Sequence, residues 1–151
     1  MANVSTSYTF MESIAAGTEQ LVREYVEMWN EREYGKASDL VTESFALYEP
    51  AVPDGDVQGP EGLVGFLRYI VDAFPDFEVE PIDVLADEGT VMMESTYVLT
   101  HKGEFEEIPP TGREVRMRGM HKFLIEGGTV AEHRLYYDLD EFFEQLGVSK
   151  P

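Results

Sequence analysis

The chain has 151 residues, a length that suits one domain with a substantial core. It carries 30 acidic and 11 basic residues, and the resulting net charge of −19 argues against nucleic acid or an anionic membrane surface as a partner. It contains no cysteine, so disulfide bonds, thiolate catalysis and cysteine-bound zinc are excluded.

The acidic residues are spread along the chain from Glu12 to Glu144, and only four of the basic residues are lysines. This pattern is typical of a protein kept soluble in concentrated salt, where screening removes the repulsion between like charges. We therefore predict a salt-adapted (halophilic) source. Unfolding measured in low-salt buffer and in molar KCl tests this prediction. Stability is expected to be lower in low salt, and equal stability in both would contradict it.

Nothing in the sequence indicates export or membrane insertion. The first ten residues, MANVSTSYTF, lack the basic segment followed by an apolar one that a secretory signal requires. No apolar run approaches the roughly 20 residues of a membrane span. We expect a cytoplasmic protein with a frayed N-terminus over residues 1–11 and a single domain over residues 12–148.

The first predicted element is a helix. Apolar residues recur at three- and four-residue steps over 21–29, Thr18 is the expected N-cap, and Gly35 ends the helix. A short second helix is predicted over 36–41.

The next segment contains a brief strand over 44–50 and a loop over 51–60, which its Pro, Gly and Asp content indicates. Pro60 suits the first turn of a third helix. The apolar stripe of that helix runs to Phe74, and Pro75 stops it.

Strand-like segments occupy most of the second half of the chain. They cover 77–86, 90–101, 113–125 and 129–138, with turns at 87–89 and 126–128 and a proline-containing loop at 102–112. Asp138 and Glu141 form a capping-box pattern for a last helix, which Gly147 ends. This order predicts an α+β fold: a cone-shaped, curved antiparallel sheet with helices packed over its concave face and a hollow interior.

Alternation puts two histidines on apolar strand faces. His121 shares a face with Met117 and Phe123, and in the preceding strand His101 shares a face with Tyr97. Two strands joined by one connection are expected to pair, and a histidine in an apolar cavity can exchange a proton near neutral pH. His121 and His101 are therefore candidate catalytic residues. The alternative for any single buried histidine is a core residue hydrogen-bonded to a backbone carbonyl.

Five residues are candidates for lining a ligand cavity: Trp29, Tyr48, Tyr97, Met117 and Phe123. The alternative for each of them is ordinary core packing. We expect His133 to be structural. The sequence contains no HExxH motif, Gly-rich phosphate loop or nucleophile elbow, so we expect neither a metal site nor a cofactor.

Several motifs occur in the order and spacing of a known family. They are MWN at 28–30, FPDF at 74–77, T-H-x-G at 100–103, PPTGR at 109–113, EGGTVAEH at 126–133 and QLG at 145–147. Over residues 18–148 the chain resembles the SnoaL-like polyketide cyclases, which belong to the nuclear-transport-factor-2-like superfamily.

The resemblance implies a cone-shaped α+β barrel whose cavity opens at one end, and which often dimerises through the outer face of its sheet. It also implies ring closure by intramolecular aldol condensation, without metal or cofactor and with an aspartate as acid–base. Relatives in the superfamily include epoxide hydrolases, ketosteroid isomerases and proteins without known activity, so the fold alone does not determine the reaction.

The chain departs from the family at positions that matter for this chemistry. His121, two residues after Gly119, stands where the cyclases have their aspartate, while His101 of the T-H-x-G motif is kept. Tyr48 replaces a histidine and Arg134 a tryptophan. A histidine can still move a proton, so acid–base chemistry remains expected, while a polycyclic substrate is not implied.

Two classes of function stay open. The first is a cofactor-free enzyme of the cyclase, isomerase or hydrolase type acting on a small, largely apolar carbonyl compound. In it His121 is the acid–base, His101 is a second proton donor or an orienting group, and Tyr48 and Tyr97 hydrogen-bond the substrate oxygen. The second is a non-catalytic ligand-binding or structural homodimer of the same fold. The expected partners are a small molecule and a second copy of the chain.

Overall fold

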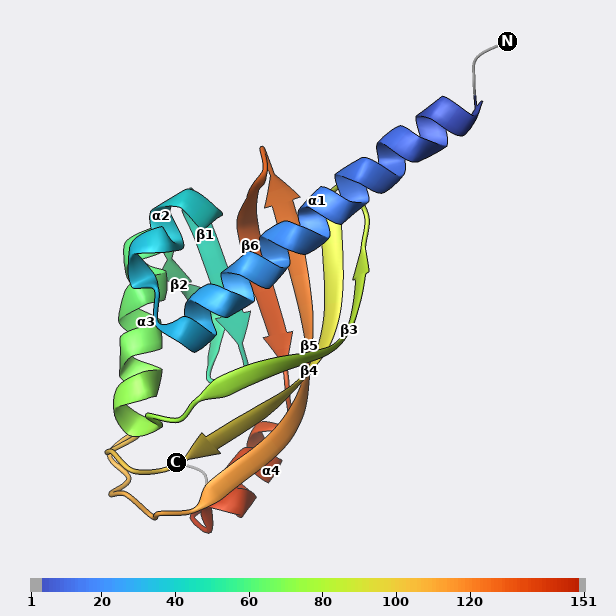
Figure 1. The fold of residues 1–151 in the computed structure, drawn as a ribbon. Coiled ribbons are helices and arrows are strands. Elements are labelled where there is room, and N and C mark those ends of the chain that lie inside the picture. Colours follow the sequence, from blue (N-terminus) through green and yellow to red (C-terminus); the bar gives the residue numbers. More distant parts are fainter. Residues whose placement is uncertain (1–3, 150–151) are drawn as a thin grey trace.

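The computed structural model describes residues 4–149, with side chains from residue 11 onward (Figure 1). Its helices are α1 (Val4–Glu31), α2 (Ala37–Leu40), α3 (Gly59–Ala73) and α4 (Leu139–Leu146), with a short 3-10 helix, η1, at Tyr34–Lys36. Its strands are β1 (Val41–Glu49), β2 (Val52–Gln58), β3 (Glu78–Ala86), β4 (Thr90–Thr100), β5 (Glu114–Glu126) and β6 (Thr129–Tyr136). None of the described helices is long and apolar enough to cross a membrane.

The described strands form one curved, open sheet in the order β2-β1-β6-β5-β4-β3 (Figure 1). The helices α1 and α3 pack over its concave face, which confirms the predicted α+β class. Neighbouring strands are antiparallel except β1 and β6, which run parallel where an antiparallel sheet was expected. Parallel neighbours need a long crossover, and most of the chain lies between these two strands.

The loop predicted for residues 51–60 is instead an edge strand, β2, which pairs only with β1. An edge position tolerates Pro53, because the missing backbone N–H removes no hydrogen bond to a second neighbouring strand. Gly55 adopts φ 71°, and a Cβ there would lie 2.5 Å from the ring of Tyr48. The Pro and Gly content that indicated a loop therefore reflects an edge strand under local constraint.

The first helix begins earlier than predicted. Residues 4–11, expected to be frayed, are helical, and residues 1–3 lie outside the described residues. Thr18 is not an N-cap, because its hydroxyl lies 2.9 Å from the carbonyl oxygen of Ala15 and 2.5 Å from that of Asp87. The second contact ties the middle of α1 to the turn between β3 and β4.

The C-terminal end of α1 is fixed against the sheet. Arg32 follows the helix with φ 60°, and its guanidinium donates to the carbonyl oxygens of Trp29, Asn30 and Phe77. The amide of Asn30 makes two hydrogen bonds to the backbone of Val79, at 2.8 and 2.9 Å. These contacts hold Trp29 over the concave face of the sheet.

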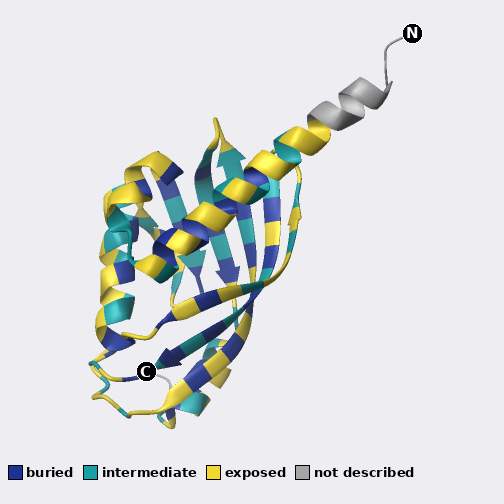
Figure 2. Ribbon diagram, viewed as in Figure 1, coloured by how far each residue is buried: buried dark blue, intermediate teal, exposed yellow. Residues whose placement is uncertain are grey.

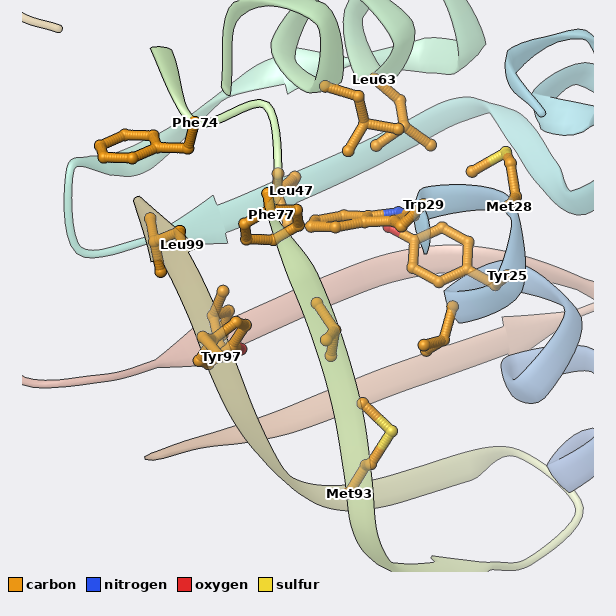
Figure 3. Close-up of a cluster of buried hydrophobic side chains, with 14 of the residues drawn as sticks. Tyr25, Met28, Trp29, Leu47, Leu63, Phe74, Phe77, Met93, Tyr97 and Leu99 are labelled. Carbon is orange, nitrogen blue, oxygen red and sulfur yellow. The ribbon is translucent and has the colours of Figure 1, made fainter. Parts of the chain in front are cut away.

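Buried residues line the inner faces of the strands and the sheet-facing sides of the helices (Figure 2). Burial alternates along β4 and β5 as predicted, with Tyr97 and His121 facing the core. Aromatic rings make up much of the interior, and Figure 3 shows Tyr25, Trp29 and Phe77 among them. Some of these rings, such as those of Tyr25 and Trp29, carry a polar atom at one end.

The predicted caps of the last helix are confirmed. The side chain of Asp138 accepts a hydrogen bond of 3.1 Å from the backbone N–H of Glu141. Gly147 adopts φ 76° at the C-terminal end of α4. The helix thereby holds Phe142 against the end of the cone where the cavity described below lies.

Candidate active site

A cavity of about 70 Å³ lies between the sheet and the helices. Its space is several times the roughly 10–15 Å³ that one water molecule requires. Ten of its lining residues are apolar or indole side chains: Trp29, Phe66, Ile70, Phe74, Phe77, Leu99, Phe105, Met117, Leu135 and Phe142. Glu49, Tyr97 and Tyr137 are the other three. A largely apolar wall with a few convergent polar groups is the usual form of a small-molecule site.

Glu49 is a buried carboxylate at the end of β1, with 6% of its surface exposed. One oxygen accepts a hydrogen bond from the backbone N–H of Ala51 in the following turn, at 2.9 Å. The other accepts from the hydroxyl of Tyr137 at 2.5 Å. Burial raises the pKa of Glu49, and these hydrogen bonds offset only part of that effect. A carboxyl with a raised pKa is suited to exchanging a proton near neutral pH.

Tyr97 lies in the middle of β4, with its ring stacked on Phe77 at a centroid distance of 6.2 Å. Its hydroxyl lies 2.6 Å from Nε2 of His121. Burial raises the pKa of Tyr97, a hydrogen bond from Ser95 lowers it, and the charge of Glu49 raises it further. The Tyr97 hydroxyl is therefore a neutral group at the cavity wall, close enough to Glu49 to sense its charge.

Gly119 makes room for the Tyr97 ring on the neighbouring strand. A Cβ at this position would lie 2.6 Å from Cε2 of Tyr97 and 2.9 Å from its hydroxyl oxygen. The buried ring cannot retreat freely, because Phe77 stacks on it and Tyr137 contacts it edge-on. Gly119 thus has a direct part in placing the Tyr97 hydroxyl.

We expect Gly119→Ala to destabilise the protein by about 1–3 kcal/mol and to displace the Tyr97 hydroxyl, because overpacking forces side chains out of their preferred rotamers. Urea unfolding and the binding of a ketone probe measure the two effects. Gly65→Ala in α3 is the matched control, since no atom lies within 4 Å of the added Cβ. Equal stability and ketone affinity in Gly119→Ala and the wild type would contradict this role.

A line of buried hydrogen bonds runs inward from His121. Its Nδ1 lies 2.8 Å from Nε2 of His133, and Nδ1 of His133 lies 2.9 Å from the hydroxyl of Tyr25. The two imidazole rings stack at a centroid distance of 5.1 Å, and Phe123 stacks on His133 at 4.3 Å. His133, expected to be structural, is thus part of the same polar line as His121.

Both of these histidines are held neutral. Burial lowers the pKa of His121 to about 3, and burial together with the neighbouring His121 lowers the pKa of His133 well below its usual value. Among the described side chains, no carboxylate makes a hydrogen bond or ion pair with either ring. Each ring therefore has one nitrogen that donates and one that accepts.

His101 lies far from His121, although it directly follows β4, the strand that pairs with β5 and its His121. His121 pairs with Met93 in the sheet register, and His101 lies eight residues beyond Met93, roughly 26 Å at 3.3 Å per residue. Nδ1 of His101 accepts a hydrogen bond from the backbone N–H of Thr111 at 3.1 Å. Its ring packs on Phe74 at 5.3 Å and is fully buried. The two histidines that the sequence suggested as one pair are therefore not brought together.

The other candidates divide between the cavity and its surroundings. Trp29, Tyr97 and Met117 line the cavity. Phe123 lies behind it against His133, and Tyr48 lies on the opposite face of β1, where its ring packs under the guanidinium of Arg134 at 4.1 Å. Successive residues of a strand face opposite sides of the sheet, so Tyr48 faces away from the cavity that its neighbour Glu49 lines.

Glu49 and Tyr137 are the site residues that the sequence did not indicate. Glu49 continues the inward alternation of Phe45 and Leu47 along β1, which is the signal that could have found it. That signal was hidden because Glu49 is one of many acidic residues in the chain. In the part of the chain whose side chains are described, no group of three or more His, Asp or Glu residues could hold a metal ion.

The fold is thus an α+β sheet curved around an apolar cavity, which has the usual form of a small-molecule site. The family profile of the SnoaL-like polyketide cyclases matches residues 19–146, and the chain belongs to this family. No curated protein matches the chain.

Solved structures show the same fold. A candidate SnoaL-like polyketide cyclase from Jannaschia sp. CCS1 is 19% identical with a TM-score of 0.80, over 91% of this chain and 96% of that one. TsrD from Streptomyces laurentii is 24% identical with a TM-score of 0.76, over 89% and 97%. AclR from Streptomyces galilaeus, described as a candidate hydroxylase, is 23% identical with a TM-score of 0.74, over 91% and 89%. These similarities establish the architecture. The reaction has to be inferred from the residues of the site.

Proposed function

We propose that the protein is a cofactor-free acid–base enzyme acting on a small, largely apolar carbonyl compound in the cavity. Glu49 is the proposed base, and Tyr97 is the proposed donor to the carbonyl oxygen. The observation that supports this assignment is the presence of both groups in an otherwise apolar cavity wall. A low-dielectric site strengthens the interactions of both groups with a reacting carbonyl.

The proposed step is removal of a proton from the carbon next to the carbonyl group. Glu49 takes the proton, the electron pair of the C–H bond forms the C=C bond of an enolate, and the negative charge moves to the oxygen. The hydroxyl of Tyr97 then stabilises that oxygen by a hydrogen bond. An intramolecular aldol condensation, an isomerisation of an unsaturated ketone and a simple enolisation all begin in this way.

In this proposal His121 acts through Tyr97. Only 2% of His121 is exposed, and it is not among the described residues that line the cavity. Its contact with the Tyr97 hydroxyl gives it influence on the reacting oxygen without contact with the substrate. The role first expected of His121 thus becomes a positioning role. The contacts of His101 with Thr111 and Phe74 support a structural role instead.

Exchange of the methyl protons of acetophenone for deuterium tests the proposed base. The wild type in heavy water is expected to accelerate this exchange, as followed by NMR, and Glu49→Gln is expected to lose at least about 100-fold of it. Glu43→Gln is the matched control, because Glu43 lies in the same strand and its side chain is exposed. Exchange unaffected by Glu49→Gln contradicts the assignment, and tight binding without exchange favours a non-catalytic binding protein.

We also propose that the protein forms a homodimer through the outer face of its sheet. Large apolar side chains are exposed there: Leu85 (77%), Tyr136 (58%), Met120 (49%) and Met92 (43%). Their positions alternate with inward-facing residues, and Leu85 pairs with Met92 and Met120 with Tyr136 in the register. Light scattering on the purified chain tests the dimer, which a monomer at micromolar concentration would contradict. The cytoplasmic location stays a prediction.

A further inference from the structure

A continuous line of buried polar groups connects α1 to the cavity wall. In order, it consists of Tyr25, His133, His121 and Tyr97, joined by contacts of 2.9, 2.8 and 2.6 Å. The side chains come from α1, β6, β5 and β4, and none of them is more than 5% exposed. We call these four residues the relay. It ends at the one hydroxyl that the proposed reaction requires.

A relay built on two neutral imidazoles has only two consistent directions. Each neutral ring carries one hydrogen, so one nitrogen donates and the other accepts. If Tyr25 donates to Nδ1 of His133, then Nε2 of His133 donates to Nδ1 of His121, and Nε2 of His121 donates toward Tyr97. If Tyr97 donates to His121 instead, each hydrogen bond reverses and the hydrogen of the Tyr25 hydroxyl needs another acceptor.

Trp29 favours the first direction. Its indole nitrogen faces the Tyr25 hydroxyl (Figure 3), and it lowers the pKa of Tyr25 against the larger raising effect of burial. The indole N–H can only donate, and it has no aligned hydrogen-bond partner among the described residues. The Tyr25 oxygen therefore turns a lone pair toward Trp29 and its hydrogen toward His133. In the reverse direction the Tyr25 oxygen would accept from both His133 and Trp29, and its own hydrogen would be buried without an acceptor among the described residues, which is unfavourable.

Ser95 completes the arrangement at the other end. Its Oγ lies 2.6 Å from Nε2 of His121, as does the hydroxyl of Tyr97. The N–H of His121 reaches the Tyr97 oxygen directly, or reaches Ser95, whose own hydroxyl then donates to Tyr97. In both cases the Tyr97 oxygen accepts a hydrogen bond from the interior. Its own hydrogen is left free to point into the cavity.

We infer that the relay runs one way, from Tyr25 to Tyr97, so that Tyr97 presents a hydrogen to the cavity and selects ligands with an acceptor oxygen. A ketone, an ester or an enolate fits such a site. A ligand hydroxyl group does not fit this site if its own hydrogen has to point at Tyr97. Tyr25, His133 and His121 are then positioning residues, since they fix the orientation of a group that touches the ligand. This inference rests on the proposed function in one respect only, namely which reaction the bound carbonyl compound undergoes.

NMR of the wild type with isotope-labelled histidine tests the direction without any substrate. Both His121 and His133 are expected to carry their hydrogen on Nε2. His101 is an internal reference, because the backbone N–H of Thr111 occupies its Nδ1 and requires the same tautomer. A hydrogen on Nδ1 of either relay histidine, an average of two tautomers, or a charged ring at pH 7 would overturn the inference.

A binding series tests the consequence at the cavity, with acetophenone as the probe. Tyr25→Phe keeps the ring but removes the hydroxyl that orients the relay, so both directions become accessible and affinity should fall about twofold or more. Tyr34→Phe, in the 3-10 helix η1 and outside the described cavity lining, should leave affinity unchanged. Unchanged tautomers and unchanged affinity in Tyr25→Phe would overturn the relay. An inactive protein with the expected tautomers would instead overturn only the proposed reaction.

Discussion

Replacing Tyr97 by phenylalanine is expected to lower kcat/KM for deuterium exchange into acetophenone by roughly 100- to 1,000-fold, the usual loss when an oxyanion donor is removed. The change removes one hydroxyl and keeps the ring that stacks on Phe77. Most of the loss should fall on kcat, because the hydrogen bond strengthens as charge develops on the oxygen.

Tyr34→Phe is the control for this prediction, since Tyr34 lies in η1, outside the sheet and outside the described cavity lining. It is expected to show wild-type kinetics. A Tyr97→Phe variant with the kcat of the wild type would remove Tyr97 from the mechanism, whatever its effect on KM. Far-UV circular dichroism and urea unfolding show whether each variant has kept its fold.

Acid is expected to unfold the protein through His121 and His133. Their pKa values in the folded state lie below the unfolded value near 6.5, with that of His121 at about 3. As the pH falls below 6.5, the unfolded chain therefore binds protons that the folded chain does not. Stability is complete above pH 6.5 and decreases by about 1.4 kcal/mol per pH unit for each histidine, down to about pH 3 for His121.

The groups that face these rings support this sign. His121 is contacted by Ser95, Tyr97 and His133, and His133 by Tyr25 and the ring of Phe123, none of which offers a negative charge to an imidazolium. Urea unfolding between pH 6.5 and pH 5 in molar KCl measures the slope while salt screens the surface carboxylates.

His121→Gln is the informative variant, because it removes one titrating group and keeps a polar side chain. Its stability should fall less steeply with acid than that of the wild type, by about 1.4 kcal/mol per pH unit. Equal slopes for the two proteins would show that His121 does not stay neutral in the folded state.

The faces of the strands could be predicted from the sequence, while their register could not. Period-two alternation correctly placed His121, Tyr97 and Met117 on the inner face, because a strand with one buried side shows its pattern locally. The distance between His121 and His101 depends on which residues pair across β4 and β5. Pairing is set by the length of the connecting loop and the packing of the whole sheet.

The same limit explains why the sequence did not indicate Glu49. Whether Tyr48 or Glu49 faces the cavity is decided by a shift of one residue. The resemblance to the family suggested Tyr48, and Glu49 is the residue that lines the cavity. The contact between the two relay histidines joins β5 to β6, and Tyr25 reaches it from α1. A spacing pattern within one element carries no information on such contacts between elements.

The bond between Tyr97 and a bound carbonyl oxygen can be measured directly from the infrared stretch of isotope-labelled acetophenone in the cavity. A hydrogen bond from Tyr97 weakens the C=O bond, so the band of the wild-type complex should lie at a lower frequency than that of the Tyr97→Phe complex. The shift should shrink in Tyr25→Phe, in which the relay no longer holds one direction. The same frequency in the wild type and in Tyr97→Phe, with acetophenone bound to both, would contradict the assignment of Tyr97 as the donor to the substrate oxygen.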